Sequence, residues 1–157
     1  MLELVLVRHA KSDWDNPTLI DHERPLNARG EHDAPAMAAR LAEAGGGPGR
    51  ILSSTAVRAR TTAAAFGAAL GAEVELIDEL YASSARTLWD TAAGAGASAV
   101  LLVAHNPGLT TLAEALSDGG IGHMPTCAVA RFSWDTDDWD VAAATDAQWA
   151  LWTPEGR

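Results

Sequence analysis

Two basic residues stand directly behind an apolar run at the start of the chain, where they could bind and attack a phosphoryl group. Residues 2–7 read LELVLV, and Arg8 and His9 follow at once. Basic residues at the end of a strand are often only solvated surface. Arg8 and His9 therefore become informative only if other segments bring matching groups to the same place.

Similar polar residues follow three further apolar runs. These runs, with the residues behind them, are 50–54 with Arg58, 73–77 with Asp78 and Glu79, and 99–104 with His105 and Asn106. If the four runs are parallel strands, their carboxyl ends share one edge of a sheet, which is where α/β proteins bind ligands. The sequence therefore predicts two histidines, two arginines and a carboxylate at that edge.

These residue types suit phosphoryl transfer. An arginine guanidinium offers a planar fork of donors that matches phosphate oxygens, so Arg8 and Arg58 would hold the group from two sides. A histidine can attack phosphorus when its nitrogen is unprotonated, and the neighbouring arginines lower the pKa of His9 by disfavouring its imidazolium. His105, if protonated, would donate to phosphoryl oxygens, and Glu79 is placed to protonate a leaving group.

The elements expected to position these residues alternate along the chain. Strands are expected at residues 2–7, 50–54, 73–77, 99–104, 128–134 and 147–153. Helices are expected over residues 34–42, 59–70, about 85–95, and from Pro107 onward with Asn106 as its cap. The connecting segments are a polar loop at 12–30, a helix stop at 45–49 and a turn-rich acidic linker at 135–140. The alternation predicts an α/β sandwich with a mainly parallel central sheet flanked by helices, in one domain over residues 1–157.

The composition limits which binding partners and which cellular compartment are expected. The formal net charge is −10, with only 11 lysines and arginines, so no nucleic-acid partner is expected. The single cysteine, Cys127, excludes an internal disulfide framework and favours a reducing, cytoplasmic setting. No apolar stretch has the length of a membrane span, and we expect neither a membrane partner nor a cofactor. The six tryptophans are expected to pack in the core and at sheet edges, apart from Trp14 in the polar loop.

Other chemistries fit the pattern less well. A metal site could use His9, His105 and a carboxylate, but the chain has no HExxH ligand pair. A GxSxG serine elbow and a Walker-type phosphate loop are also absent from the sequence. The remaining histidines, His22, His32 and His123, lie in or beside loops and are expected at the surface.

Five motifs in this order resemble those of the histidine phosphatase superfamily, and most closely its small SixA-type phosphohistidine phosphatases. The motifs are LVRHAKSDW (6–14), RPLNARG (24–30), SSTAVRARTTA (53–63), DELY (78–81) and VAHNPGL (103–109). The resemblance runs from the first strand to about Leu116. It implies a phosphoglycerate mutase-like three-layer fold whose C-terminal strands are antiparallel.

The resemblance also implies a role for each matching residue. His9 corresponds to the nucleophile, and the phosphate pocket corresponds to Arg8, Arg58 and His105. Glu79 corresponds to the acid that protonates the leaving group in larger relatives. Lys11 and Arg24 are carried over as candidate substrate contacts, and Arg24 could equally be a structural ion-pair residue. The mechanism implied is metal-independent and passes through a phosphohistidine on the enzyme.

Departures from the family pattern bear on the substrate. Ala10, Thr55 and Thr61 stand where a glycine, a proline and a glutamine are frequent, and none of them removes a phosphate ligand. The chain has little room for the helical insertions that cover the site in larger relatives. We therefore expect an open, shallow site acting on a phosphorylated protein side chain. The alternatives are a general phosphomonoesterase acting on small phosphorylated metabolites and a non-catalytic phosphate-binding module.

Overall fold

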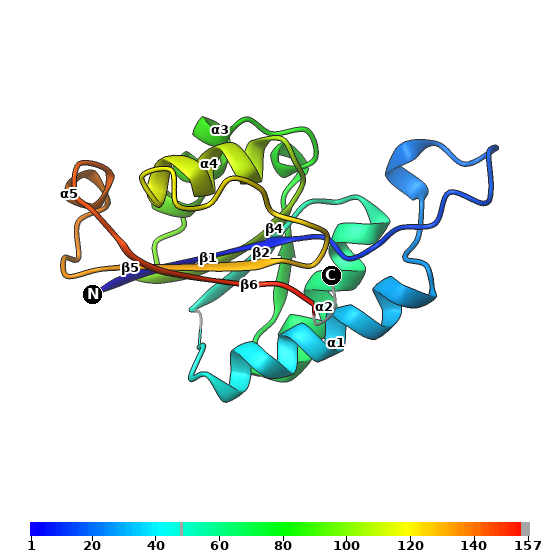
Figure 1. Cartoon of the computed structure of the whole chain (residues 1–157), viewed down its shortest axis with the longest axis horizontal. Helices are drawn as coiled ribbons and strands as arrows, with labels where there is room; N and C mark the ends of the chain where they lie inside the picture. The colour runs from blue at the N-terminus through cyan, green and yellow to red at the C-terminus, as the bar shows by residue number, and fades with distance from the viewer. Residues whose placement is uncertain (48, 155–157) are drawn as a thin grey trace.

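The computed structural model, which describes residues 1–47 and 49–154, folds around one six-stranded sheet (Figure 1). The strands are β1 Leu2–Arg8, β2 Arg50–Ser53, β3 Val74–Leu76, β4 Ala99–Ala104, β5 Val129–Trp134 and β6 Gln148–Trp152. They lie in the order β3-β2-β4-β1-β5-β6. The four strands from β3 to β1 are parallel, whereas β5 pairs antiparallel with both β1 and β6. The expected sheet, mainly parallel with antiparallel C-terminal strands, is confirmed.

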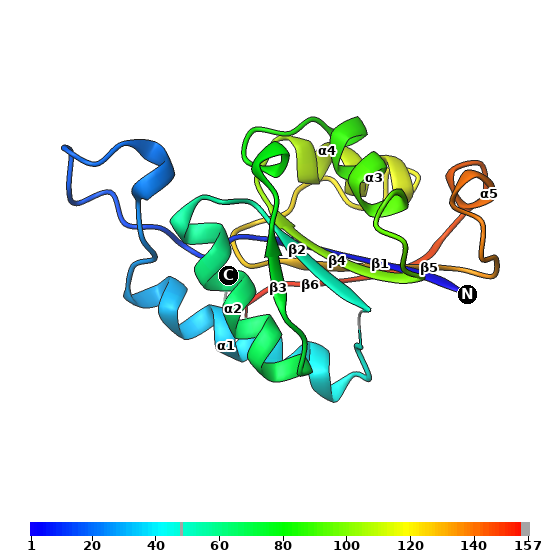
Figure 2. The ribbon, with the colours of Figure 1, turned by 180° about the vertical axis from the view of Figure 1, so that it is seen from behind.

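Helices cover both faces of the sheet (Figures 1 and 2). They are α1 Ala28–Glu43, α2 Val57–Leu70, α3 Ala85–Ala93, α4 Gly108–Leu116 and α5 Trp139–Ala143. Successive side chains of a strand point to opposite faces. Val5 and Val7 of β1 therefore pack in the core with α1 and α2, while Leu4 and Leu6 pack in the core with α3 and α4. Burial on both faces explains the continuous apolar run in the sequence.

The first helix and the loop before it differ in extent from the expectation. α1 begins at Ala28, well before residue 34, because Asn27 caps it by accepting a hydrogen bond from the Gly30 N–H at 2.9 Å. The loop also contains a short 3-10 helix, η1 Asp21–Glu23. The expected helix stop at 45–49 includes residue 48, which lies outside the described residues. The prediction of one domain over 1–157 likewise extends beyond them and stays a prediction.

The acidic linker before the last strand is partly helical, unlike the expected turns. Asp138 caps α5 by accepting a hydrogen bond from the Asp140 N–H at 2.8 Å. The ring of Trp139 then packs edge-on against that of Trp89, with 5.5 Å between the ring centroids. Trp89 packs edge-on against Trp134 in the same way, at a centroid distance of 5.6 Å. These tryptophans bury aromatic area against the sheet, as expected. Within residues 1–47 and 49–154, no helix is both long and apolar enough to cross a membrane.

The register of the parallel strands aligns their carboxyl ends. Arg8 of β1 pairs with Ala104 of β4, and Ser53 of β2 pairs with Val103. The backbone pairing continues one residue further, since the His9 N–H donates to the Ala104 carbonyl oxygen at 3.2 Å. The residues that follow β1, β2 and β4 therefore emerge at one edge of the sheet.

Candidate active site

The carboxyl ends of β1 and β4 place the two predicted site histidines side by side. The ring centroids of His9 and His105 are 5.1 Å apart, with an angle of 49° between the ring planes. Both side chains are buried, with 7% and 8% of their surface exposed. The structure thus brings together two residues that are 96 positions apart in the sequence.

His9 is held as a neutral ring with one nitrogen available. Its Nδ1 donates to the Ala10 carbonyl oxygen at 2.8 Å, and a carbonyl only accepts, so the single proton of the neutral ring lies on Nδ1. Burial, with smaller contributions from neighbouring positive groups, lowers the pKa of His9 to about 3. Nε2 therefore keeps its lone pair near neutral pH, as a nucleophile requires.

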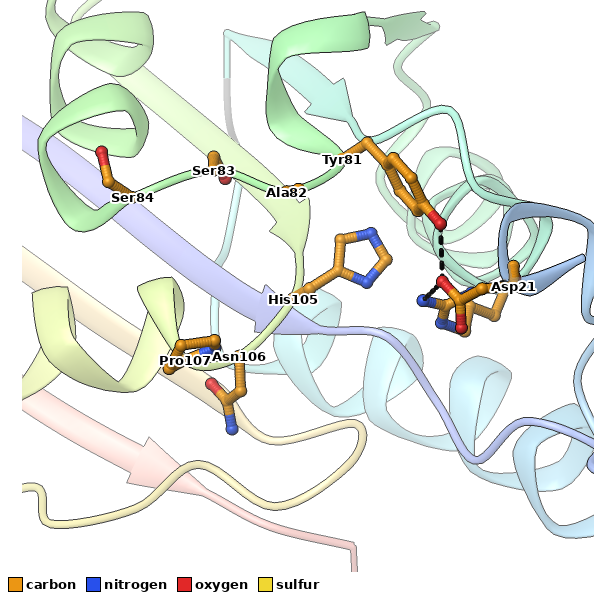
Figure 3. Close-up of a pocket in the computed structure, with 9 residues that line it drawn as sticks. Asp21, Tyr81, Ala82, Ser83, Ser84, His105, Asn106 and Pro107 are labelled. Carbon is orange, nitrogen blue, oxygen red and sulfur yellow. Dashed lines mark hydrogen bonds and ion pairs between the residues drawn. The ribbon is translucent and has the colours of Figure 1, made fainter.

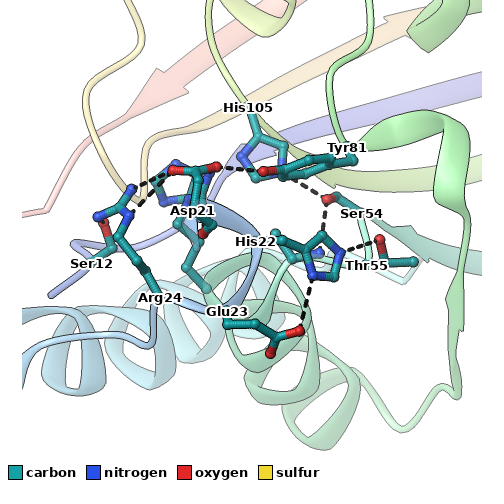
Figure 4. Close-up of polar contacts among 12 residues, drawn as sticks. Ser12, Asp21, His22, Glu23, Arg24, Ser54, Thr55, Tyr81 and His105 are labelled. Carbon is teal, nitrogen blue, oxygen red and sulfur yellow. Dashed lines mark hydrogen bonds and ion pairs between the residues drawn. The ribbon is translucent and has the colours of Figure 1, made fainter. Parts of the chain in front are cut away.

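Ser54, which follows β2, anchors the second histidine. His105 Nε2 lies 2.7 Å from Ser54 Oγ (Figure 4). The other ring nitrogen, Nδ1, is buried and has no hydrogen-bond partner among the described residues. Burial, together with the charge of Arg58, lowers the pKa of His105 to about 4. At neutral pH the ring offers one N–H, where an imidazolium would offer two.

Two arginines beside the histidines have unused donors. Arg8 Nη1 donates to the Met124 carbonyl oxygen at 3.2 Å, and the buried Arg58 donates through both terminal nitrogens to Asp21. The Nε atom of each arginine is buried and lacks a hydrogen-bond partner in the described part of the chain. Burial, with the charge of Arg58, lowers the pKa of Arg8. Because buried unpaired donors are costly, these groups are suited to an anion that accepts from them.

A cavity of about 450 Å³ opens beside His105 (Figure 3). Its lining residues are Asp21, Arg58, Tyr81, Ala82, Ser83, Ser84, His105, Asn106 and Pro107. The Tyr81 ring stands at 86° to the His105 ring and forms one wall. The N-cap of α4 is Pro107 rather than the expected Asn106, although Asn106 Oδ1 accepts a hydrogen bond from the Thr110 N–H at 3.1 Å. The cavity leaves room for a leaving group next to the cationic residues.

Of the predicted site residues, Arg58 and His105 line the cavity, whereas Arg8, His9, Lys11, Arg24 and Glu79 are not among its lining residues. Glu79 is part of the 3-10 helix η2 Asp78–Leu80, and its side chain is exposed. Lys11 is half-buried, and its carbonyl oxygen accepts a hydrogen bond from the Asn27 N–H at 3.0 Å. The residue of the DELY motif that reaches the cavity is Tyr81, two positions after Glu79.

Arg24 is engaged with its own loop (Figure 4). It is buried, and it donates to Ser12 Oγ at 2.8 Å and to Asp21 Oδ1 at 3.2 Å. Its guanidinium carbon also lies 3.3 Å from the centre of the Trp14 ring, and Trp14 itself is 68% exposed. Arg24 was expected to be either a substrate contact or a structural ion-pair residue, and its contacts in the structure are those of an ion-pair residue.

Sequence reasoning missed four residues around the site. Asp21, Ser54 and Tyr81 contact Arg58 or His105, and His22 packs edge-on against Tyr81. The His22 ring is partly buried, with Nε2 2.8 Å from Thr55 Oγ1. Asp21 and His22 lie in a loop rather than behind a strand, so the strand-end rule could not find them. Ser54 and Tyr81 stood within the motifs already noted and could have been found.

Comparisons with known proteins agree with this geometry. The model of the histidine phosphatase superfamily (branch 1) matches residues 4–84. An uncharacterised chloroplastic protein of Arabidopsis thaliana is 32% identical over 154 residues, covering 90% of this chain and 70% of its own.

Solved structures with the same fold carry the SixA name. One is a protein from Agrobacterium tumefaciens that is named as a phosphohistidine phosphatase SixA. It is 33% identical to this chain, with a TM-score of 0.78, and the match covers 84% of this chain and 91% of the other. Its namesake from Nakamurella multipartitia is 28% identical, with a TM-score of 0.80 over 99% and 97% of the two chains. On the family match and the relatives together, this chain belongs to the histidine phosphatase superfamily.

Proposed function

We propose that the protein is a phosphohistidine phosphatase of the SixA type, in which His9 carries the phosphoryl group from the substrate to water. The observation that carries the proposal is the state of His9. Its Nδ1 is tied to the Ala10 carbonyl oxygen, which leaves Nε2 unprotonated beside a cationic, buried set of donors. A residue that only bound phosphate would need a proton on the nitrogen facing the anion.

The first step transfers the phosphoryl group to the enzyme. The unpartnered nitrogens of Arg8, Arg58 and His105 donate hydrogen bonds to the phosphoryl oxygens, and the two arginines offset the negative charge. Nε2 of His9 attacks phosphorus, so a P–N bond forms to the enzyme while the P–N bond to the substrate imidazole breaks. The leaving imidazole takes up a proton from solvent or from the site.

The second step returns the enzyme to its starting state. A water molecule attacks phosphorus, the bond to His9 Nε2 breaks, and inorganic phosphate leaves. The ring of His9 is neutral again, with its proton still on Nδ1. No step calls on a metal ion, and the enzyme is therefore proposed to be metal-independent.

A phosphorylated protein side chain is the substrate class that suits this site. Among the described elements, the inserted helical segments beside the cavity are only three residues long, η1 Asp21–Glu23 and η2 Asp78–Leu80. The cavity is bordered by the small residues Ala82, Ser83 and Ser84. A site bordered in this way admits a side chain that projects from a larger surface.

Phosphate release from a phosphohistidine peptide tests the proposal. The reaction should proceed with a chelator present, and His9→Ala should abolish it. His32→Ala, which removes an exposed histidine, is the matched control and should keep full activity. Release only from small phosphomonoesters would move the assignment to a general phosphomonoesterase. Phosphate binding without any release would indicate a non-catalytic binding module, and loss of release on chelation would refute metal independence.

A further inference from the structure

We propose that Asp21 is a positioning residue, which holds Arg58 by its terminal nitrogens so that the Nε side of the guanidinium faces the phosphoryl group. The inference rests on the proposed function, because it concerns the same phosphoryl site. Asp21 lines the cavity but belongs to the loop before α1, where no family motif quoted above includes it.

The hydrogen bonds of Arg58 divide its guanidinium into two sides. Nη1 donates to the Asp21 backbone oxygen at 2.7 Å, and Nη2 donates to Asp21 Oδ2 at 2.9 Å. A guanidinium has five N–H groups in a rigid plane, so fixing the two terminal nitrogens also fixes the direction of the Nε–H. That Nε is the buried atom that has no partner within residues 1–47 and 49–154. Asp21 thus takes one side of Arg58 and leaves the other for an anion.

The Asp21 carboxylate is saturated with donors, as Figure 4 shows. Oδ2 accepts from Arg58 and from the Tyr81 hydroxyl at 2.6 Å, and Oδ1 accepts from two nitrogens of Arg24 at 3.2 Å. Two carboxylate oxygens offer about four acceptor sites, and all are used. The Tyr81 hydrogen bond and the Arg58 charge hold the pKa of Asp21 well below its usual range. Asp21 is therefore unsuited to donate or take a proton during the reaction.

The loop that carries Asp21 is itself held in place. Ser12 pairs with Leu26 in an isolated bridge, and the Asp13 N–H donates to the Pro25 carbonyl oxygen at 2.8 Å. Arg24 closes the same loop through Ser12 Oγ. The two ends of the loop are thus joined, which fixes the position of Asp21 over Arg58. A contact outside the reacting atoms can affect the reaction rate in this way, because it holds a group that binds the substrate in the right position.

Positioning and charge predict opposite effects when Asp21 is neutralised. Removing a negative charge beside Arg58 makes the site more positive, which by Coulomb attraction alone would strengthen anion binding. Losing the hold on Arg58 would misdirect its Nε–H and weaken binding. We expect the second effect to win, because the unpartnered donors are directional hydrogen-bond groups.

Binding of inorganic phosphate, measured by calorimetry at neutral pH, separates these effects. Asp21→Asn keeps the size of the side chain and should weaken phosphate binding by roughly ten- to a hundredfold. Tyr81→Phe removes only the hydroxyl donor and should weaken binding in the same direction by less. Asp15→Asn, an equal charge change at an exposed position of the same loop, is the control and should leave binding unchanged.

Kinetics give the second readout and the outcomes that would overturn the proposal. In Asp21→Asn, KM for the phosphohistidine peptide should rise, and the pH profile should keep its shape. Phosphate binding as tight as in the parent, or tighter, would overturn the proposal, because losing the hold on Arg58 would then not weaken binding. Loss of one limb of the pH profile would make Asp21 an acid or base. If the parent protein itself neither binds nor releases phosphate, the proposed function fails first, and this inference fails with it.

Discussion

Lowering the pH from 7.5 to 5 should destabilise the fold through His9 and His105, because both rings are buried in the neutral form. Their pKa values in the folded protein, about 3 and about 4, lie below the ordinary value of 6.5. Between these values and 6.5 the unfolded chain takes up two protons that the folded protein does not. The stability is therefore complete above pH 6.5 and falls as the pH drops toward 4.

The size of the loss follows from the distance below 6.5. A pH of 5 lies about one and a half units below the histidine pKa in the unfolded chain. Because one pH unit is worth about 1.4 kcal/mol, each histidine lowers the free energy of unfolding by about 2 kcal/mol. The result depends little on the folded pKa values, because both rings stay neutral at pH 5. Asp21, with its lowered pKa, remains ionised in the fold and largely ionised in the unfolded chain at this pH.

Urea unfolding at the two pH values tests the reasoning. Between pH 7.5 and 5, His9→Gln should lose about 2 kcal/mol less stability than the parent protein. His32→Gln removes an exposed histidine and should lose as much as the parent. If His9→Gln and the parent lose the same amount, the fold does not hold His9 neutral, and the account of its nucleophilicity is refuted.

Three further substitutions test the surroundings of the site. Ser54→Ala leaves His105 Nε2 without its partner and should cost about 1–3 kcal/mol of stability and lower kcat/KM; an unchanged urea midpoint would contradict this. Glu79→Gln should change phosphate release from a phosphohistidine peptide by less than about threefold, because the carboxylate is exposed; a loss of about 10²-fold or more would make Glu79 the leaving-group acid. Gly108→Ala would overlap the Ser83 carbonyl oxygen and should cost about 1–3 kcal/mol in thermal unfolding, with equal stability arguing against this close approach.

The site residues at the strand ends were predictable because each strand is marked by its own short apolar run, and the site residues come directly after these runs. Continuous apolar runs marked β1 and β4, and the rule that parallel strands end at one edge placed His9 beside His105. Arg58 followed from the same rule, since it lies in the first turn of the helix after β2. For these residues, the type and the position relative to a strand were enough.

The loop residues were not predictable in the same way. Asp21 reaches Arg58 across 37 positions, through a 3-10 helix that has no apolar periodicity. Arg24 could be an ion-pair residue or a substrate contact, and only its bonds to Ser12 and Asp21 distinguish the two. Asn27 lies within the predicted polar loop, whereas in the structure its side chain caps α1. Side-chain partners across a loop depend on tertiary packing, which a single sequence does not display.

Trapping the phosphorylated enzyme tests the central claim most directly. The protein is mixed with a phosphohistidine peptide that carries a radioactive phosphoryl group, stopped in alkali, where phosphohistidine survives, and digested to locate the label. The account predicts label on His9, retained in His32→Ala and absent in His9→Ala. Label on His105, or phosphate release by His9→Ala at the parent rate, would contradict it.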